Sequence, residues 1–130
     1  MARRERSGFR NLNVWQKAMV AVKEIYQLTR RFPKDELYAL TSQTRRAAAS
    51  VPMNIAEGYK RRRYPKDYVR LLVTAHGSQG EVETAIEIAY MLEYITEADC
   101  ERLLDVYDEL GRMLNGLIDS VDKGANKNNR

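Results

Sequence analysis

The sequence predicts an all-α protein, a single up-down-up-down antiparallel four-helix bundle, and three observations support this fold class. The chain has 130 residues of which 44% are hydrophobic, enough for one domain with its own core. Apolar residues recur at three- and four-residue spacing through four long stretches, about 14–31, 34–61, 65–94 and 97–122. The connections between these stretches are short, so consecutive helices must run antiparallel.

The first predicted helix covers about 14–31. Asn13 is expected to cap it, with Gln16 reaching back three residues, and the helix ends before Pro33 because a residue that precedes proline is pushed out of the α region. The side chains expected in the core are Trp15, Ala18, Val22, Ile25, Thr29 and Phe32.

The second predicted helix covers about 34–61, with Pro33 in its first turn. Pro52 removes one backbone hydrogen bond inside it, so we expect a kink, and the alternative is a helix that restarts with Ser50 as its cap. Its expected core line is Leu37, Leu40, Thr44, Ala47, Val51, Ile55 and Tyr59.

The third predicted helix covers about 65–94 and begins at Pro65, with Asp67 in its first turn. Gly77 and Gly80 weaken a helix, so we expect them to permit a close approach between helices. The expected core line is Tyr68, Leu72, Ala75, Gln79, Val82, Ile86 and Ala89.

The fourth predicted helix covers about 97–122. Thr96 and Asp99 form the pattern of a capping box, and Lys123-Gly124 is expected to end the helix. Its core line is Leu103, Tyr107, Leu110, Leu114, Leu117 and Val121.

Three segments follow from these assignments: a basic flexible arm at 1–12, the bundle at 13–123 and a polar tail at 124–130. Cys100 is the single cysteine, so no intrachain disulfide can form. The sequence has no apolar stretch of the ~20 residues that a membrane span needs. We therefore expect a cytoplasmic protein with no membrane partner.

Charge is distributed unequally along the chain. Residues 1–70 hold 17 Lys+Arg and 6 Asp+Glu, net +11, whereas residues 71–130 hold 5 and 12, net −7. Such asymmetry favours a partner with many negative charges. Arg3, Arg4 and Arg6 of the arm add to a basic surface whose interleaved tyrosines offer stacking for unpaired bases. The residues predicted to bind nucleic acid are Arg45, Arg46, Lys60, Arg61, Arg62, Arg63, Lys66 and Arg70. The alternative is a solvated helix end, because cations are favoured there by the helix dipole.

Ser50, Asn54 and Glu57 are three or four residues apart and so line one side of a helix. They have no activating base near them in sequence, and His76 is the only histidine, so a structural role at a helix or subunit contact is favoured over catalysis. Ten acids and one base between 81 and 111 indicate a solvated acidic face that can complement a basic surface. We expect no enzyme activity, no cofactor and no metal site.

The third predicted helix carries a second apolar line beyond the one that the bundle core needs: Val69, Val73, Ile88, Met91 and Ile95. A helix that is apolar on more than one side is normally buried on more than one side. The line therefore predicts self-association.

The segments FPKDELYAL, QTRRAAASVPMNIAEGYKR and HGSQGEVETAIEIAYMLEYI resemble the four-helix-bundle proteins that are encoded in 23S rRNA intervening sequences. The resemblance covers about Asn13 to Val121, and SVPMNIAEG is its most specific part. It implies a bacterial, cytoplasmic, non-enzymatic bundle that assembles as a homopentamer. A related branch serves as the accessory protein of diversity-generating retroelements, where it binds a reverse transcriptase and structured RNA.

Two functions therefore stay open. The first is an oligomeric module that binds structured RNA, such as rRNA or retroelement RNA, through its basic surface. The second is a protein-interaction scaffold or adaptor, for example for a reverse transcriptase, with an incidental basic surface.

Overall fold

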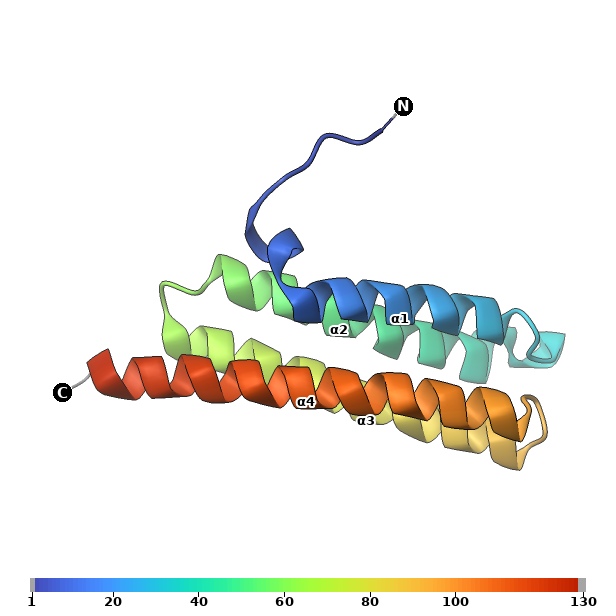
Figure 1. Cartoon of the computed structure of the whole chain (residues 1–130). Helices are drawn as coiled ribbons and strands as arrows, with labels where there is room; N and C mark the ends of the chain where they lie inside the picture. Colours follow the sequence, from blue (N-terminus) through green and yellow to red (C-terminus); the bar gives the residue numbers. More distant parts are fainter. Residues whose placement is uncertain (1, 129–130) are drawn as a thin grey trace.

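The computed structural model describes residues 2–128, with side chains through residue 126. It confirms the bundle, whose four long helices are α1 (Asn13–Thr29), α2 (Ser42–Lys60), α3 (Pro65–Met91) and α4 (Glu97–Asn128). Helix α1 packs on α2 and α4, and α3 also packs on α2 and α4, so each helix contacts two neighbours. The helices run antiparallel, and the last turns of α4 extend beyond the α2–α3 turn (Figure 1).

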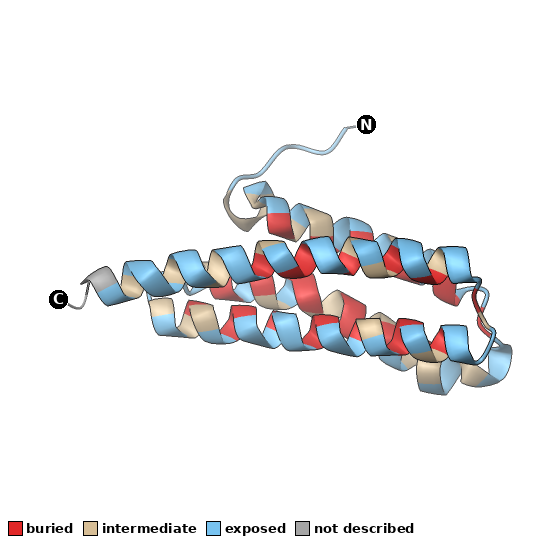
Figure 2. Ribbon diagram, turned by 60° about the horizontal axis from the view of Figure 1, so that its bottom comes forward, coloured by how far each residue is buried: buried red, intermediate tan, exposed pale blue. Residues whose placement is uncertain are grey.

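One apolar core runs along the bundle axis, and the buried positions form stripes on the inner sides of the helices (Figure 2). The predicted core line of α3 is buried at all seven positions, because a strict four-three alternation keeps one side of a helix inward. Polar residues cover the outer sides. Within the described part of the chain, no helix is both long and apolar enough to cross a membrane.

The start of α1 differs from the prediction. Leu12 occupies the cap position without a side-chain hydrogen bond, and Asn13 is already the first helical residue. The Gln16 amide does reach back, but it donates to the backbone oxygen of Arg10 at 2.8 Å. This bond stabilises a short 3-10 helix, η1 (Gly8–Asn11), so this part of the predicted arm is folded against the bundle.

The predicted helix 34–61 is wrong at its beginning. The chain forms a 3-10 helix, η2 (Lys34–Glu36), and a π-helical segment, η3 (Leu37–Thr41), before α2 begins at Ser42. Ala39 has non-helical dihedral angles, which turn Leu37 outward to 46% exposure, although the apolar spacing places it in the core line. Helix α2 is continuous through Pro52, which excludes a restart at Ser50, and the kink at Pro52 stays a prediction.

Close helix contacts occur at glycines other than the expected pair. A Cβ atom on Gly77 or Gly80 would meet nothing within 4 Å, so the prediction that they bring helices together within the subunit is wrong. A Cβ on Gly58 would lie 2.9 Å from the Tyr68 ring, and one on Gly111 would lie 2.7 Å from the amide nitrogen of Gln79. Tight packing of α2 on α3 and of α3 on α4 therefore depends on Gly58 and Gly111.

The ends of α3 and α4 also differ from the predicted bounds. Helix α3 ends at Met91, three residues early, because Glu93 adopts a left-handed conformation (φ 66°). Thr96 then caps α4 as predicted, accepting a hydrogen bond from the Asp99 backbone N–H at 3.1 Å. Helix α4 continues through Gly124 to Asn128, so the stop at Lys123-Gly124 is wrong, and residues 129–130 of the predicted tail lie outside the described residues.

Candidate nucleic-acid interface

Six basic residues surround the turn between α2 and α3, and we call this surface the basic end. The turn is short because Tyr64 is followed by Pro65, which begins α3. Backbone hydrogen bonds from Arg61 to Glu57 and Gly58, and from Tyr64 to Arg61 at 2.8 Å, close the turn. The basic end comprises Lys60, Arg61, Arg62, Arg63, Lys66 and Arg70, all of them exposed.

Aromatic packing holds the two helices together beneath the basic end. The Tyr68 ring is buried against Gly58 and meets the Tyr59 ring edge-on, with centroids 6.3 Å apart. Burial raises the pKa of the Tyr68 hydroxyl, with a smaller contribution from Tyr59, while Arg62 acts in the opposite direction. Tyr68 is therefore a neutral packing group beneath a charged surface.

Several cations of the basic end lie over aromatic rings. The Arg62 guanidinium is 4.1 Å from the Tyr59 ring centroid, and its Nη1 donates to the Tyr59 backbone oxygen at 3.0 Å. The Arg63 guanidinium is 5.9 Å from the Tyr64 ring. A planar guanidinium beside an aromatic ring provides a surface on which a nucleobase can stack, while the positive charge of the guanidinium contacts a phosphate.

Acidic side chains compensate only one of these cations. The Arg61 guanidinium lies 4.0 Å from both Glu57 and Asp67. Among the described residues, Lys60, Arg62 and Arg63 have no carboxylate within ion-pair distance. The charge available to an external anion therefore comes mainly from positions other than Arg61.

Arg45 and Arg46 do not belong to this surface. They lie toward the opposite end of α2, 15 and 14 residues before Lys60, or about 22 and 21 Å along a helix. Arg45 is fixed within the subunit, because its Nε donates to Thr29 at 2.8 Å and its guanidinium lies 4.8 Å from the Tyr26 ring. The prediction that Arg45 and Arg46 bind nucleic acid stays a prediction, and it concerns a region of α2 apart from the basic end.

Phe9 lies beside the basic end, a position that the sequence did not predict. Lys60 Nζ is 6.0 Å from the Phe9 ring centroid, and the Arg10 guanidinium is 4.5 Å from it. Gly8 has φ +87°, and its Cα faces the Tyr59 ring. A phenylalanine that follows a glycine within the basic arm was the available signal in the sequence. The arm has no apolar periodicity, so this signal alone did not predict a packed position for Phe9.

A different arrangement joins α1 to α4, and we call it the seam. Lys17 pairs with Glu109 at 2.9 Å, Arg31 with Asp99 at 2.7 Å, and Arg102 with Glu24 at 2.7 Å. The hydrogen bond from Arg31 lowers the pKa of Asp99, and that from Lys17 lowers the pKa of Glu109. Part of the acidic surface predicted from the sequence is thus neutralised within the subunit.

The polar cluster on α2 is partly confirmed. Asn54 Nδ2 donates to Ser50 Oγ at 2.9 Å, and Ser50 Oγ lies 2.8 Å from Ser78 Oγ of α3. The cluster therefore links α2 to α3, as a structural role requires, and it includes Ser78, which the sequence did not single out. Glu57 is not part of it, because this exposed side chain faces Arg61.

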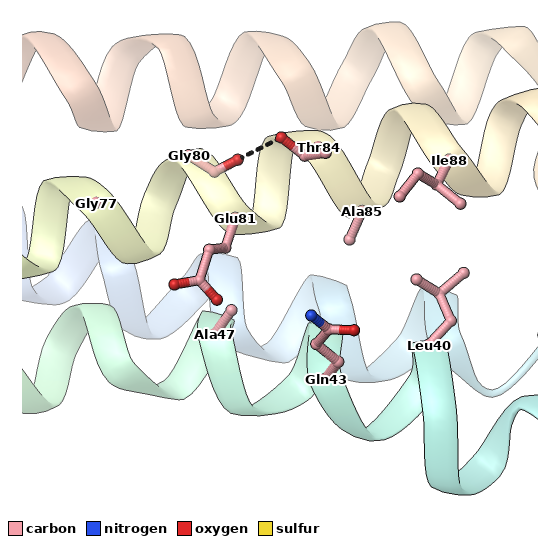
Figure 3. Close-up of a pocket in the computed structure, with 9 residues that line it drawn as sticks. All are labelled: Leu40, Gln43, Ala47, Gly77, Gly80, Glu81, Thr84, Ala85 and Ile88. Carbon is pink, nitrogen blue, oxygen red and sulfur yellow. Dashed lines mark hydrogen bonds between the residues drawn. The ribbon is translucent and has the colours of Figure 1, made fainter.

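Ile88, one residue of the second apolar line, faces an open groove between α2 and α3, drawn in Figure 3. The groove has a volume of about 500 Å³, and Gly77, Gly80, Ala47 and Ile88 help to line it. Of the other predicted contact residues, Val73 and Met91 are exposed and Val69 is half-buried. Ile95 is a correction: it is 6% exposed and belongs to the subunit core, so it cannot contact another subunit.

The residue types that bind metals are scattered over the described part of the chain. No group of three or more His, Cys, Asp or Glu side chains there is arranged to hold a metal ion. Cys100 is buried, and burial followed by the hydrogen bond to Glu87 raises the pKa of its thiol. A buried thiol with a raised pKa is a poor nucleophile.

A comparison with protein families agrees with the resemblance seen in the sequence. The family model described as 23S rRNA-intervening sequence protein matches residues 10–116. The chain belongs to this family. The matched range contains the basic end and the groove, while Arg3, Arg4 and Arg6 precede it.

Among solved structures, one of the family's relatives shares the fold. It is a protein of unknown function from the S23 ribosomal protein family of Bacteroides thetaiotaomicron VPI-5482. The two chains are 23% identical, the match covers 81% of this chain and 97% of that one, and the TM-score is 0.74. No curated protein matches this chain.

Proposed function

We propose that this family member is a non-enzymatic, self-associating protein that binds structured RNA through its basic end. The observation that carries the proposal is the concentration of exposed, uncompensated cations around the α2–α3 turn, with aromatic rings between them. The family's description names a 23S rRNA intervening sequence, and RNA is therefore the anion to test first.

Release of counterions from the RNA supplies the binding free energy in this proposal. Each phosphate that a lysine or arginine neutralises releases condensed counterions, so the affinity grows with the number of such contacts. Lys66 and Arg70 lie one turn apart on α3 and extend the charged surface beyond the turn. The basic end offers charge and stacking without a recognisable base-reading module, so discrimination among RNA sequences is expected to be poor.

Self-association is the second part of the proposal, and the groove between α2 and α3 supports it. Val73 is 53% exposed and Met91 is 69% exposed, and both belong to the same predicted apolar line as Ile88, which lines the groove. Burial of this line against other copies of the chain would stabilise an assembly. A closed ring, which the resemblance implies to be a pentamer, would repeat the basic end around its axis and raise the avidity for one long RNA.

The RNA-binding part is tested by fluorescence anisotropy with the full chain. A labelled RNA hairpin is titrated with protein at about 50 mM and about 200 mM salt, and we expect saturable binding that weakens strongly at the higher salt. Absence of binding at low salt and tens of micromolar protein would overturn the proposal.

The self-association part is tested by analytical ultracentrifugation. Ile88→Asp places a charge in the groove and should give monomers with unchanged helix content, whereas Val20→Asp, at an exposed apolar position of α1, should leave the assembly intact. A wild-type protein that sediments as a stable monomer at micromolar concentration would refute self-association. Loss of helix content in the Ile88→Asp protein would instead assign Ile88 to the subunit core.

A protein scaffold, for example for a reverse transcriptase, is the second candidate function, and one observation favours it. Tyr38 is 93% exposed and lies with Tyr26 and Leu37 beside a shallow pocket of about 390 Å³ at the end of the bundle opposite the basic end. Exposed aromatic side chains of this kind are typical of protein interfaces. This candidate becomes the better one if removal of the basic-end charges leaves RNA affinity unchanged.

A further inference from the structure

A groove separates the N-terminal arm from the first two turns of α1, and the arm arginines that line it lie outside the basic end. It has a volume of about 620 Å³, and four arginines help to line it. Glu5 is the single acidic residue among the lining side chains. The lining arginines are Arg3, Arg4, Arg6 and Arg10.

Two aromatic rings form one wall of this groove. The Phe9 and Trp15 rings meet edge-to-face, with centroids 5.4 Å apart and an interplanar angle of 63°. Trp15 is half-buried, and the Arg10 guanidinium lies 4.5 Å from the Phe9 ring centroid, so a base that stacks on this face of Phe9 takes the place of Arg10. Every nucleobase has such a flat face, and unpaired bases stack on rings of this kind.

The beginning of α1 adds to the positive potential of the groove. Its cap position, Leu12, contributes no side-chain hydrogen bond, and the first turn of the 17-residue helix carries no acidic residue. The positive end of the helix dipole is therefore not compensated locally. The guanidinium groups of the arm and this helix end favour the same ligand, an anion.

We propose that the arm groove binds an unpaired nucleotide of RNA, with its base against Phe9 and Trp15 and its phosphates on the arm arginines. This inference rests on the proposed function and deepens it, because it names single-stranded segments as the part of the RNA that the arm recognises. The Lys60 ammonium lies 6.0 Å from the Phe9 ring, so one RNA can contact the groove and the basic end together. A hairpin loop over the groove and its stem over the basic end satisfy both surfaces.

The chain provides its own probe, because Trp15 is the one tryptophan in the sequence. We would follow its fluorescence while titrating the full chain with the 12-nucleotide RNAs rA12 and rU12 and with the rA12·rU12 duplex. Stacking of an unpaired base beside Trp15 should quench the emission with rA12, and the duplex, whose bases are paired, should quench much less.

Two variants test the residues named. Phe9→Leu removes the ring, and the triple variant Arg3→Gln, Arg4→Gln, Arg6→Gln removes the arm charges. Each should weaken rA12 binding roughly tenfold and reduce the preference for single-stranded over duplex RNA. The matched control is the triple variant Lys23→Gln, Arg30→Gln, Lys34→Gln, which removes three exposed charges from α1 and η2 and should keep that preference.

The outcomes separate this inference from the proposed function. If the hairpin binds through the basic end but Trp15 emission does not change with rA12 and the arm variants bind normally, the groove inference is wrong and the proposed function stands. If polyglutamate competes as well as rA12 for the same site, the groove recognises only negative charge and the nucleotide inference is also wrong. If no RNA binds at low salt, both proposals fail.

Discussion

The cations of the seam and the cations of the basic end have the same chemistry but different partners. In the seam, Lys17, Arg31 and Arg102 each lie within 2.9 Å of a carboxylate on the opposite helix. At the basic end, Arg61 is the one cation within ion-pair distance of a carboxylate among the described residues, and only at 4.0 Å. The cations of the seam are therefore paired within the subunit, whereas those of the basic end remain available to an external anion.

This difference teaches that a count of charged residues does not locate a binding surface. The net charge of +11 over residues 1–70 includes cations of both kinds, and the sequence cannot tell them apart. Pairing within the fold adds a little stability and removes the cation from binding, since the paired carboxylate repels an incoming phosphate. Loss of three charges should therefore weaken RNA binding strongly at the basic end and change it little in the seam.

The largest expected effect is on RNA affinity. The variant Lys60→Gln, Arg62→Gln, Arg63→Gln, called the basic-end variant, should bind the RNA hairpin roughly 10- to 100-fold more weakly at about 50 mM salt. Its matched control is the seam variant, Lys17→Gln, Arg31→Gln, Arg102→Gln, which loses the same charge from paired positions. The seam variant should bind within a few-fold of wild type, and equal losses in both would show that only net charge matters.

The next effect concerns how the basic end is built. Gly58→Ala forces a methyl group against the Tyr68 ring, with 2.9 Å from Cβ to Cδ1, and against Leu71 Cβ at 3.3 Å. We expect a loss of about 1–3 kcal/mol in the free energy of unfolding, measured by urea denaturation.

The matched control for this substitution is Gly116→Ala, because Gly116 lies in the interior of α4 with open space around it. That change should stabilise the fold by about 0.5–1 kcal/mol, since alanine is the better helix former. A neutral effect of Gly58→Ala would show that Tyr68 moves freely and that the turn is not held by this contact.

The smallest effect belongs to a single seam pair and depends on pH. Arg31 lowers the pKa of Asp99 below its usual 3.8, so the pair stabilises the folded state above that value and loses its contribution as the pH falls through the lowered pKa. Arg31→Gln should therefore cost about 0.2–1 kcal/mol at pH 6, and this cost should shrink below pH 3.8. Urea denaturation of both proteins at several pH values measures the difference, and a cost that stays constant into acid would exclude this pair as its source.

The sequence predicted the bundle because long apolar repeats decide which side of a helix is buried. The same repeat misled at Leu37, where it continues into a segment whose backbone leaves the α conformation at Ala39. Gly124 did not end α4, because this helix end extends beyond the turn and no packed element forces the chain to leave it (Figure 1). The backbone conformation near Leu37 and the end of α4 depend on how these segments pack in the folded protein, which a local sequence pattern does not show.

The sequence predicted only the part of the candidate site whose cations are close neighbours in the chain. Lys60 to Arg63 and Lys66 are consecutive or nearly so, and the fold keeps them together. Phe9 is 51 positions before Lys60 in the sequence and lies near it because η1 packs against the bundle. No spacing in the sequence predicts that contact. The prediction that Ile95 contacts another subunit assumed that the third helix continues to about residue 94. Helix α3 ends at Met91, so Ile95 does not follow its helical spacing and is buried in the subunit core.

The salt dependence of RNA binding tests the central claim most directly. The logarithm of the association constant for the hairpin is measured against the logarithm of salt concentration for wild type, the basic-end variant and the seam variant. If phosphates contact the basic end, the basic-end variant should have a slope shallower by roughly 2 to 3 units, because each lost contact removes ~0.7–0.9. The seam variant should run parallel to wild type. Three parallel lines, or a seam variant that flattens as much as the basic-end variant, would contradict the assignment of RNA binding to the α2–α3 turn.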